Sequence, residues 1–315
     1  MTSAWQRVFQ GIRADHRSGA SALLADALEA ARLFLVATRR VPTRRLAADL
    51  ARFTRRLTAS QPSMAPFLTL ANALWLCVDE APGGLTWNRL HEALVGYADA
   101  VDRGLLGTIR NGARVVKRGS LVLTYSHSTV VRLALRCAMA AGRRFEVVCS
   151  ESRPMGEGVV LARRLAYAGI TTHLTTDAAL PGWMDRVDLV LVGADAVLSR
   201  GVVNKVGTEP LLRAARRAKV PSYVLADASK WLPEGLAEFW RSREEASGEI
   251  IRLRHPNLRM ENRYFDCSPP SLLTGLVWEG GVAQPADLRR RLAAFETSKS
   301  LIAFLRGRDA AHLDA

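Results

Sequence analysis

Strand and helix patterns alternate in the second part of the chain, and this alternation constrains the fold more than any other feature. From about residue 118, short runs of leucine and β-branched residues alternate with stretches whose apolar residues recur at helical spacing. Strands separated by helices in this way build βαβ units and a mostly parallel sheet. The expected strands are 120–124, 145–149, 170–175, 189–192 and 222–226, with helices at 130–141, 158–168 and 209–218 between them. The pattern predicts a Rossmann-like domain.

The first part of the chain carries only helical patterns. Helices are expected at 19–33, 44–57, 65–77 and 90–106, with breaks at proline-containing segments. We therefore expect an α/β protein with a helical N-terminal domain at 1–110 and a Rossmann-like domain with a mostly parallel sheet at 111–315, the latter ending in a helix at 286–306. The first strand is not followed by the GxGxxG fingerprint, so neither NAD nor FAD is supported and no cofactor is expected.

The formal net charge of +14 raises the question of nucleic-acid binding. Of the 44 basic residues only five are lysines, and the arginines are spread over the predicted helical surfaces. No helix-turn-helix, zinc-finger or aromatic RNA-binding motif accompanies them. This distribution argues against nucleic acid as the main ligand. It also draws attention to Lys205 and Lys230, which follow predicted strands in a chain that otherwise favours arginine.

Other compositional features exclude further classes of site. The four cysteines and six histidines are dispersed without ligand-type spacing, so no metal site is expected. No apolar run approaches the roughly 20 residues that span a bilayer. The N-terminal segment also lacks the apolar core of a signal peptide. We expect a cytoplasmic protein with no membrane partner.

The segment 188–205 is the first candidate for chemistry. It reads as a buried strand that ends in Gly193-Ala194-Asp195 and continues as a polar loop. Ligands of open α/β sheets bind outside the carboxyl ends of the strands, where Asp195 is expected. Asn204 and Lys205 follow, and Gly207-Thr208 opens a predicted helix whose N-terminus could bind an anion. This combination is suited to a small phosphorylated substrate.

Other polar segments also follow predicted strands or precede predicted helices. They are 17–20, 124–129, 151–158 and 226–230. Each has an ordinary structural explanation, such as a turn, a helix cap or a solvated loop. Together they predict one pocket at the carboxyl edge of the sheet. A serine hydrolase is disfavoured, because the neighbouring Ser126 and His127 should point in opposite directions and no GxSxG motif is present.

Several motifs support a family resemblance. Residues 122–131, the ESRP element at 151–154, GADAVLSRGVVNKVGT at 193–208 and ADASKW at 226–231 resemble the superfamily of aldose-1-phosphate to ketose-1-phosphate isomerases. That superfamily includes ribose-1,5-bisphosphate isomerase, methylthioribose-1-phosphate isomerase and the α, β and δ regulatory subunits of translation initiation factor 2B. Residues 264–270 and 280–285 are similar to its C-terminal motif, so the resemblance covers about 110–295 in order.

The resemblance implies roles for individual residues. Asp195 matches the catalytic aspartate, Asn204 and Lys205 match a substrate-contacting pair, and Lys230 matches a later active-site lysine. The phosphate-contacting element and further substrate contacts are assigned to Arg17, Gly19, Ala20, His127, Ser128 and Arg153. The chain departs from the pattern at Ser126, where the isomerases have a catalytic cysteine, and at Gln61, where the ribose-bisphosphate enzymes have a phosphate-binding arginine.

The first departure leaves two functions open. A thiol with a pKa near ~8.5 can donate a proton as a sugar ring opens, whereas a serine hydroxyl is a much weaker acid. In an isomerase, Asp195 would move a proton between C2 and C1 through an enediol, and Ser126 or His127 would replace the missing acid. The alternative is a non-catalytic sugar-phosphate-sensing or scaffold protein, like the regulatory subunits. The resemblance also implies a homo-oligomer, a dimer at least, and the sequence does not identify the sugar.

Overall fold

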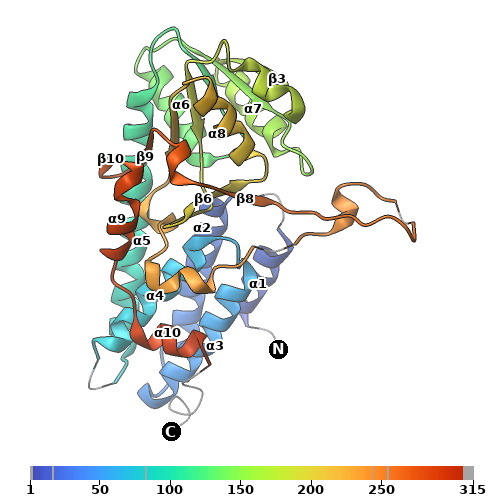
Figure 1. The fold of residues 1–315 in the computed structure, drawn as a ribbon. Coiled ribbons are helices and arrows are strands. Elements are labelled where there is room, and N and C mark those ends of the chain that lie inside the picture. Colours follow the sequence, from blue (N-terminus) through green and yellow to red (C-terminus); the bar gives the residue numbers. More distant parts are fainter. Residues whose placement is uncertain (1–2, 16–17, 82–83, 243, 254, 308–315) are drawn as a thin grey trace. The chain divides into compact units, whose positions relative to one another are not determined.

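The computed structural model of the chain describes residues 3–15, 18–81, 84–242, 244–253 and 255–307 (Figure 1). The chain forms two compact units. We call Met1–Asp102, Ser229–Arg241 and Arg290–Ala315 the helical unit, and Arg103–Ala228 with Ser242–Arg289 the sheet unit. Each unit therefore contains separate stretches of the sequence.

The helical unit is built on four helices and the first part of a fifth. They are α1 (Ala4–Ala14), α2 (Ala20–Thr38), α3 (Thr43–Ser60), α4 (Ala65–Asp79) and α5 (Trp87–Val115), whose second part belongs to the sheet unit. Four aromatic side chains from α1, α2 and α3 form one cluster: Phe34 and Phe53 lie 4.7 Å apart between ring centroids, Trp5 packs on both, and Phe9 packs on Trp5 and Phe53. This burial explains why the early helices pack into one bundle.

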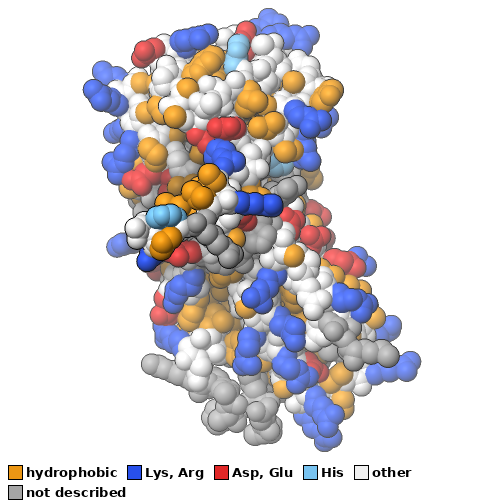
Figure 2. Space-filling model, turned by 90° about the vertical axis from the view of Figure 1, so that its right-hand side faces the viewer, with side chains coloured by type: hydrophobic (Ala, Val, Ile, Leu, Met, Phe, Trp, Pro, Cys, Tyr) orange, Lys and Arg blue, Asp and Glu red, His pale blue; other side chains and the backbone are white. Residues whose placement is uncertain are grey.

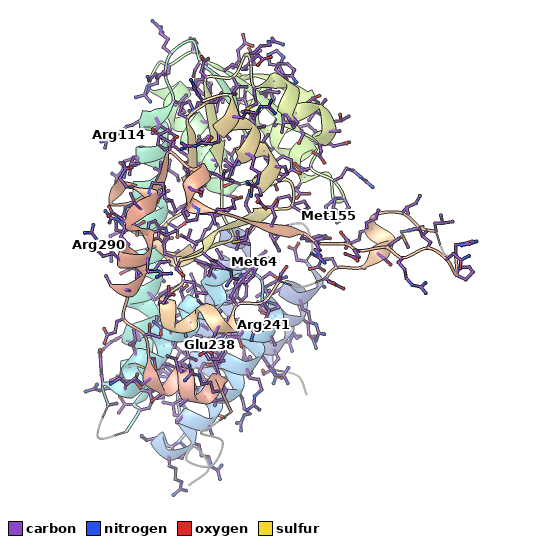
Figure 3. The ribbon with its side chains drawn as sticks, in the orientation of Figure 1. Met64, Arg114, Met155, Glu238, Arg241 and Arg290 are labelled. Atoms are coloured by element: carbon purple, nitrogen blue, oxygen red, sulfur yellow. The ribbon has the colours of Figure 1, made fainter. Side chains whose placement is uncertain are left out.

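Two later segments of the chain also belong to the helical unit. From the sequence pattern, both were expected in the second domain, which begins near residue 110. In the first segment, which contains η3 (Glu234–Phe239), the indole of Trp240 donates to the Ser63 carbonyl at 2.9 Å. Figure 3 labels Glu238 and Arg241 of this segment and Met64 of the helical unit. In the second segment, Phe304 of α10 (Lys299–Leu305) stacks on Trp75 with centroids 4.9 Å apart. Contacts of Trp240 and Phe304 hold these two segments in the helical unit. The sequence pattern does not reveal such contacts.

The sheet unit confirms the predicted fold class. Its main sheet contains seven strands: β1 (Leu121–Leu123), β2 (Glu146–Ser150), β3 (Thr171–Thr175), β4 (Leu189–Val192), β7 (Ser222–Leu225), β9 (Gly275–Trp278) and β10 (Gly281–Ala283). Their order is β10-β9-β7-β4-β1-β2-β3, and every neighbouring pair is parallel except β9 and β10. β4 is buried at all four residues, as a strand covered on both faces should be.

Helices cover the main sheet of the sheet unit (Figure 1). α6 (Thr129–Ala140), α7 (Glu157–Tyr167) and the second part of α5 contribute to one core with the strands, in which Val122, Leu135 and Leu191 are fully buried. α8 (Thr208–Arg217) packs against β7. The predicted terminal helix at 286–306 is two short helices, α9 (Leu288–Ala293) and α10.

The stretch after Asp195 is a hairpin, not the expected polar loop. β5 (Ala196–Leu198) and β6 (Gly201–Lys205) pair antiparallel, and β6 pairs with β8 (Phe265–Ser268) to form a second sheet. Valine and leucine residues between the polar ones favour strands in this segment. Every residue of β5 and β6 is buried. Between η3 and β8, the chain extends from the sheet as an arm that includes η4 (Ser247–Glu249) (Figure 1).

Candidate functional site

The candidate site lies at the carboxyl ends of β1 and β4, where the strand order of the main sheet reverses. β1 pairs with β2 on one side and with β4 on the other, so the chain leaves their carboxyl ends toward opposite sides. A crevice at such a switch point is the usual ligand position in an open α/β sheet. The loop after β1 carries Ser126, His127 and Ser128, and the loop after β4 carries Asp195.

The loops after β1 and β4 lie against each other at Gly193. A Cβ atom at this position would lie 2.4 Å from Ser128 Oγ, so any larger residue would force the loops apart. Ser128 is the N-cap of α6 and its hydroxyl accepts the Val131 N–H. The approach places the segment that leads to Asp195 beside the segment that contains Ser126.

Ser126 has an unusual backbone conformation for a non-glycine residue. Its φ is 64°, in the left-handed region, and its N–H donates to Ser152 Oγ at 3.0 Å. Ser152, in the loop after β2, also has a positive φ of 61°. Such conformations cost roughly 1–3 kcal/mol each and are concentrated at functional sites. Both serines are held at the carboxyl edge against this cost.

The loop after β2 is held by one carboxylate and brings Glu157 to the site. Asp177 accepts the N–H groups of Ser152 and Arg153 at 2.8 and 2.7 Å. Figure 3 labels Met155, which belongs to this loop. α7 then begins at Glu157, close to the end of β2, because Gly158 has no side chain: a Cβ atom there would lie 1.8 Å from the Ser150 carbonyl oxygen.

Glu157 joins two of the predicted site residues. Its Oε1 accepts a hydrogen bond from Ser126 Oγ at 3.1 Å and lies 2.8 Å from the ammonium of Lys205. The Lys205 side chain is only 5 % exposed, and its ammonium also lies 4.5 Å from the centre of the Tyr264 ring. We call Ser126, Glu157 and Lys205 the Ser–Glu–Lys cluster.

The N-terminus of α8 does not have the open form that the sequence suggested. Asp266 of β8 accepts the N–H groups of Gly207 and Glu209 at 2.8 and 3.0 Å, so a carboxylate of the chain already occupies the place proposed for a phosphate. Burial raises the pKa of Asp266 to about 6, against the lowering effect of these N–H donors. The Asn204 amide also turns to this helix, donating to Thr208 Oγ1 at 3.0 Å.

His127 is not a source of protons at neutral pH. Burial, and after it the charges of Arg164 and Arg132, lower its pKa to about 4. Its Nε2 lies 3.1 Å from a guanidinium nitrogen of Arg164. Because guanidinium only donates, Nε2 accepts and the ring proton resides on Nδ1. A lowered pKa disfavours the expected role of His127 as a replacement for the missing acid, and that role stays a prediction.

Arg153 turns toward the arm. Its guanidinium donates to the Ile250 carbonyl at 3.0 Å. With Val206, Asn262 and Arg263 it lines an open pocket of about 430 Å³. Val206 directly follows Lys205, so this pocket adjoins the Ser–Glu–Lys cluster.

Asp195 is half-buried at the start of the β5–β6 hairpin, where its N–H donates to the Val203 carbonyl at 2.8 Å. The remaining predicted site residues belong to the helical unit, and their convergence with Asp195 stays a prediction. Gly19 is the N-cap of α2, which begins at Ala20, and Lys230 ends η2 (Ala228–Lys230). Arg17 lies outside the described residues.

Gln61 has a structural role in the helical unit. Its side-chain amide donates to the carbonyls of Ile12 and Asp15 at 2.9 and 3.3 Å. These carbonyls lie at the end of α1, where helical partners are missing. The residue found in place of an expected arginine thus closes a helix terminus.

Two residues that organise the site, Glu157 and Asp266, could not be recognised from the sequence pattern. Glu157 is an ordinary acidic residue in the first turn of a helix. Asp266 is an ordinary polar residue in a short strand. The pairing of Glu157 with Lys205 depends on a contact across 48 positions of sequence, which periodicity cannot predict. Asp266 lies in the motif at 264–270, and that motif does not show what Asp266 contacts.

Among the described residues there is no group of three or more His, Cys, Asp or Glu side chains arranged to hold a metal ion. In the same part of the chain no helix has the length and apolarity needed to cross a membrane. On the face drawn in Figure 2, Lys and Arg side chains are interspersed with acidic and hydrophobic ones. That face shows no single basic patch.

Comparisons with known proteins agree with the motifs. The model of the initiation factor 2 subunit family matches residues 16–285. A curated relative from Archaeoglobus fulgidus, named ribose 1,5-bisphosphate isomerase, is 33% identical over 181 residues, which are 55% of this chain and 57% of the relative. The alignment thus spans little more than half of that relative's length.

Solved structures show the same fold. Translation initiation factor eIF-2B from Pyrococcus horikoshii aligns with a TM-score of 0.78 and 26% identity, over 89% of this chain and 97% of that chain. 5-Methylthioribose 1-phosphate isomerase from the same organism aligns with a TM-score of 0.69 and 24% identity, over 91% and 86% of the two chains. The sequence resemblance is confirmed, and the chain belongs to the initiation factor 2 subunit family.

Proposed function

We propose that the protein is a sugar-phosphate isomerase that converts an aldose 1-phosphate to the corresponding ketose 1-phosphate. The observation that carries this proposal is the contact of the two loops at the switch point, where Gly193 and Ser128 bring the Asp195 segment beside Ser126. The name of the Archaeoglobus fulgidus relative supports ribose 1,5-bisphosphate as the first substrate to test. 5-Methylthioribose 1-phosphate is the second, from the name of a structural neighbour.

The reaction needs one base and one acid. The bond between C1 and the ring oxygen breaks, and the ring oxygen keeps the electron pair and takes a proton from the acid. Asp195 removes the C2 proton, and the electrons of that C–H bond form the C1–C2 double bond. The O2 hydroxyl then returns a proton to the acid while Asp195 delivers its proton to C1. The product has a carbonyl at C2 and keeps the phosphate on C1.

Two carboxylates argue against a phosphate at Lys205 and the N-terminus of α8. Lys205 and the N-terminus of α8 already face carboxylates, from Glu157 and Asp266 respectively. A phosphate dianion there would meet two negative charges. Phosphate binding by Lys230, Gly19 and Ala20, and sugar contacts by Asn204 and Lys205, stay predictions of the family resemblance.

The substitution Asp195→Asn tests this function. Without the base, conversion and exchange of the C2 proton should fall by at least about 10³-fold, because no other group carries the proton between the carbons. Proton NMR of ribose 1,5-bisphosphate or 5-methylthioribose 1-phosphate in D₂O measures both. Asp185→Asn, an exposed aspartate outside the site, is the matched control and should keep full activity. Turnover unaffected by Asp195→Asn would exclude the assignment of the base.

A second candidate is a non-catalytic protein that senses or displays a sugar phosphate. Ser126 in place of a thiol and the neutral His127 favour it, because neither is a sufficient acid alone. This candidate predicts thermal stabilisation by the same sugar phosphates without conversion or C2 exchange in wild type.

The oligomeric state belongs to the same proposal. We propose a homodimer, as the family resemblance implies. Light scattering at several protein concentrations tests it, and a monomer at all of them would contradict it.

A further inference from the structure

The Ser–Glu–Lys cluster has features that a structural ion pair does not need. A buried ammonium and a carboxylate neutralise each other without help, yet Glu157 Oε1 also accepts the proton of Ser126. That hydroxyl is held there by a left-handed backbone and by the bond from Ser126 N–H to Ser152. A strained backbone thus holds a hydroxyl against the carboxylate.

Both hydrogen bonds of the cluster converge on one carboxylate oxygen. Ser126 Oγ donates its single proton to Glu157 Oε1 in this structure, and its lone pairs can accept a further proton. The ammonium of Lys205 donates to the same carboxylate oxygen. The cluster therefore connects a proton source to a hydroxyl oxygen through one carboxylate, with distances of 2.8 and 3.1 Å.

Other groups around the cluster limit escape of the proton. The ring of Tyr264 covers the Lys205 ammonium, and its own hydroxyl donates to Glu249 rather than to the cluster. Glu157 Oε2 is buried and has no hydrogen-bond partner among the described residues. The proton of Lys205 therefore has one charged acceptor in the cluster, Glu157 Oε1.

We propose that Lys205, Glu157 and Ser126 form a proton relay that replaces the single acid required for opening the sugar ring. This inference rests on the proposed isomerase function. As the bond between C1 and the ring oxygen breaks, the Ser126 hydroxyl turns its proton from Glu157 to the ring oxygen, which takes it. Ser126 takes a proton from Glu157, and Glu157 takes one from Lys205, which becomes a neutral amine. When O2–H later loses its proton, the same path carries a proton back to Lys205, so no proton is gained or lost.

In this relay Ser126 touches the substrate and is a catalytic residue. Glu157 acts through Ser126 and is a positioning residue. This division explains how a serine, too weak an acid alone, can stand at the position of a thiol. It also explains why His127 can be neutral without preventing the reaction.

A double-mutant cycle tests the relay. Ser126→Ala and Glu157→Gln should each lower kcat by roughly 10²-fold or more, with KM changed less than about threefold, and the double variant should be no slower than the worse single variant. Groups that act as a unit give this non-additive result. Losses that multiply in the double variant would overturn the relay.

A thiol background provides the rescue. Ser126→Cys supplies an acid of its own, so Glu157→Gln introduced into Ser126→Cys should change kcat less than about threefold. An equally large loss in both backgrounds would show that Glu157 only supports the structure. Glu146→Gln, on an exposed carboxylate at the other end of β2, is the matched control in both backgrounds.

A second measurement does not depend on turnover. Iodoacetamide should alkylate the thiol of Ser126→Cys roughly tenfold faster at pH 7 when Glu157→Gln is also present, because the neighbouring carboxylate disfavours the thiolate. Wild type measures the background from the four native cysteines. Equal rates would overturn the contact itself. If wild type converts no aldose 1-phosphate but this rate change is found, the proposed function fails while the proton-sharing cluster is retained.

Discussion

Glu157 and Asp266 both contact the segment from Lys205 to Glu209, but the chain neutralises them in different ways. Glu157 faces a buried ammonium at 2.8 Å and a serine hydroxyl. Asp266 accepts two backbone N–H groups at the start of α8. Burial raises the pKa of Asp266 to about 6 despite these donors. The N–H groups at the start of α8 therefore do not offset the effect of burial on Asp266.

Glu157 contacts groups that can exchange protons, whereas Asp266 is a fixed cap of α8. The partners of Glu157 are side chains that can exchange protons, whereas peptide N–H groups keep theirs. Asp266 also blocks the helix N-terminus that the sequence offered as an anion site. We therefore expect substitutions at the two positions to differ in size and in pH dependence.

The largest effect is expected from Lys205→Met. Removing one partner of a buried ion pair leaves Glu157 charged and uncompensated, which should cost about 3–5 kcal/mol of unfolding free energy at pH 7. Urea denaturation measures this loss. The double variant Lys205→Met with Glu157→Leu removes both charges and should recover most of it. A loss below about 1 kcal/mol for Lys205→Met alone would show that Glu157 does not need the Lys205 ammonium. The proposed difference between Glu157 and Asp266 would then fail.

Asp266→Asn should have an effect that depends on pH. The folded-state pKa of about 6 is higher than the ordinary value of 3.8, so the folded protein binds the proton more tightly than the unfolded chain. This contribution to stability is full below pH 4 and is lost as pH rises through about 6. The loss amounts to about 3 kcal/mol. The asparagine keeps an acceptor for the N–H groups but does not titrate.

Urea denaturation of wild type and Asp266→Asn at pH 4 and pH 8 tests this linkage. Relative to wild type, the variant should be more stable at pH 8 than at pH 4, by about 3 kcal/mol. Other titrating groups cancel in the difference. A difference that is the same at both pH values would mean that the N–H groups of α8 offset the burial of Asp266 fully.

The strand and helix alternation predicted the main sheet well because local periodicity determines it. The fully buried β4, for example, was found at its predicted residues. The β5–β6 hairpin from Ala196 to Lys205 was missed because its valines and leucine are mixed with polar residues, and its pairing with β8 joins residues about 60 positions apart. Local patterns contain no information on such contacts.

The candidate site divides in the same way. Asp195 and Ser126 were predicted because they follow strands, and the sheet order places those two strands side by side. The partner of Lys205 was not predicted, since a glutamate in a first helical turn is ordinary and only the close approach at Gly158 brings it to the site. The helix N-terminus of α8 was predicted to be open because nothing local reveals that Asp266 caps it.

The smallest effect is expected from Glu209→Gln, which tests whether like charge adds to the strain on Asp266. Glu209 forms an exposed pair with Arg213 and contributes to raising the pKa of Asp266. Loss of an exposed pair costs a few tenths of a kcal/mol, and relief of the repulsion offsets it, so stability at pH 7 should change by less than about 0.5 kcal/mol. The pKa of Asp266 should fall, which makes the variant more stable relative to wild type at pH 8 than at pH 4. Denaturation at both pH values measures this, with Asp266→Asn as the background in which the pH-dependent part should vanish. If it persists there, Glu209 acts on another group and the comparison of the two carboxylates loses this support.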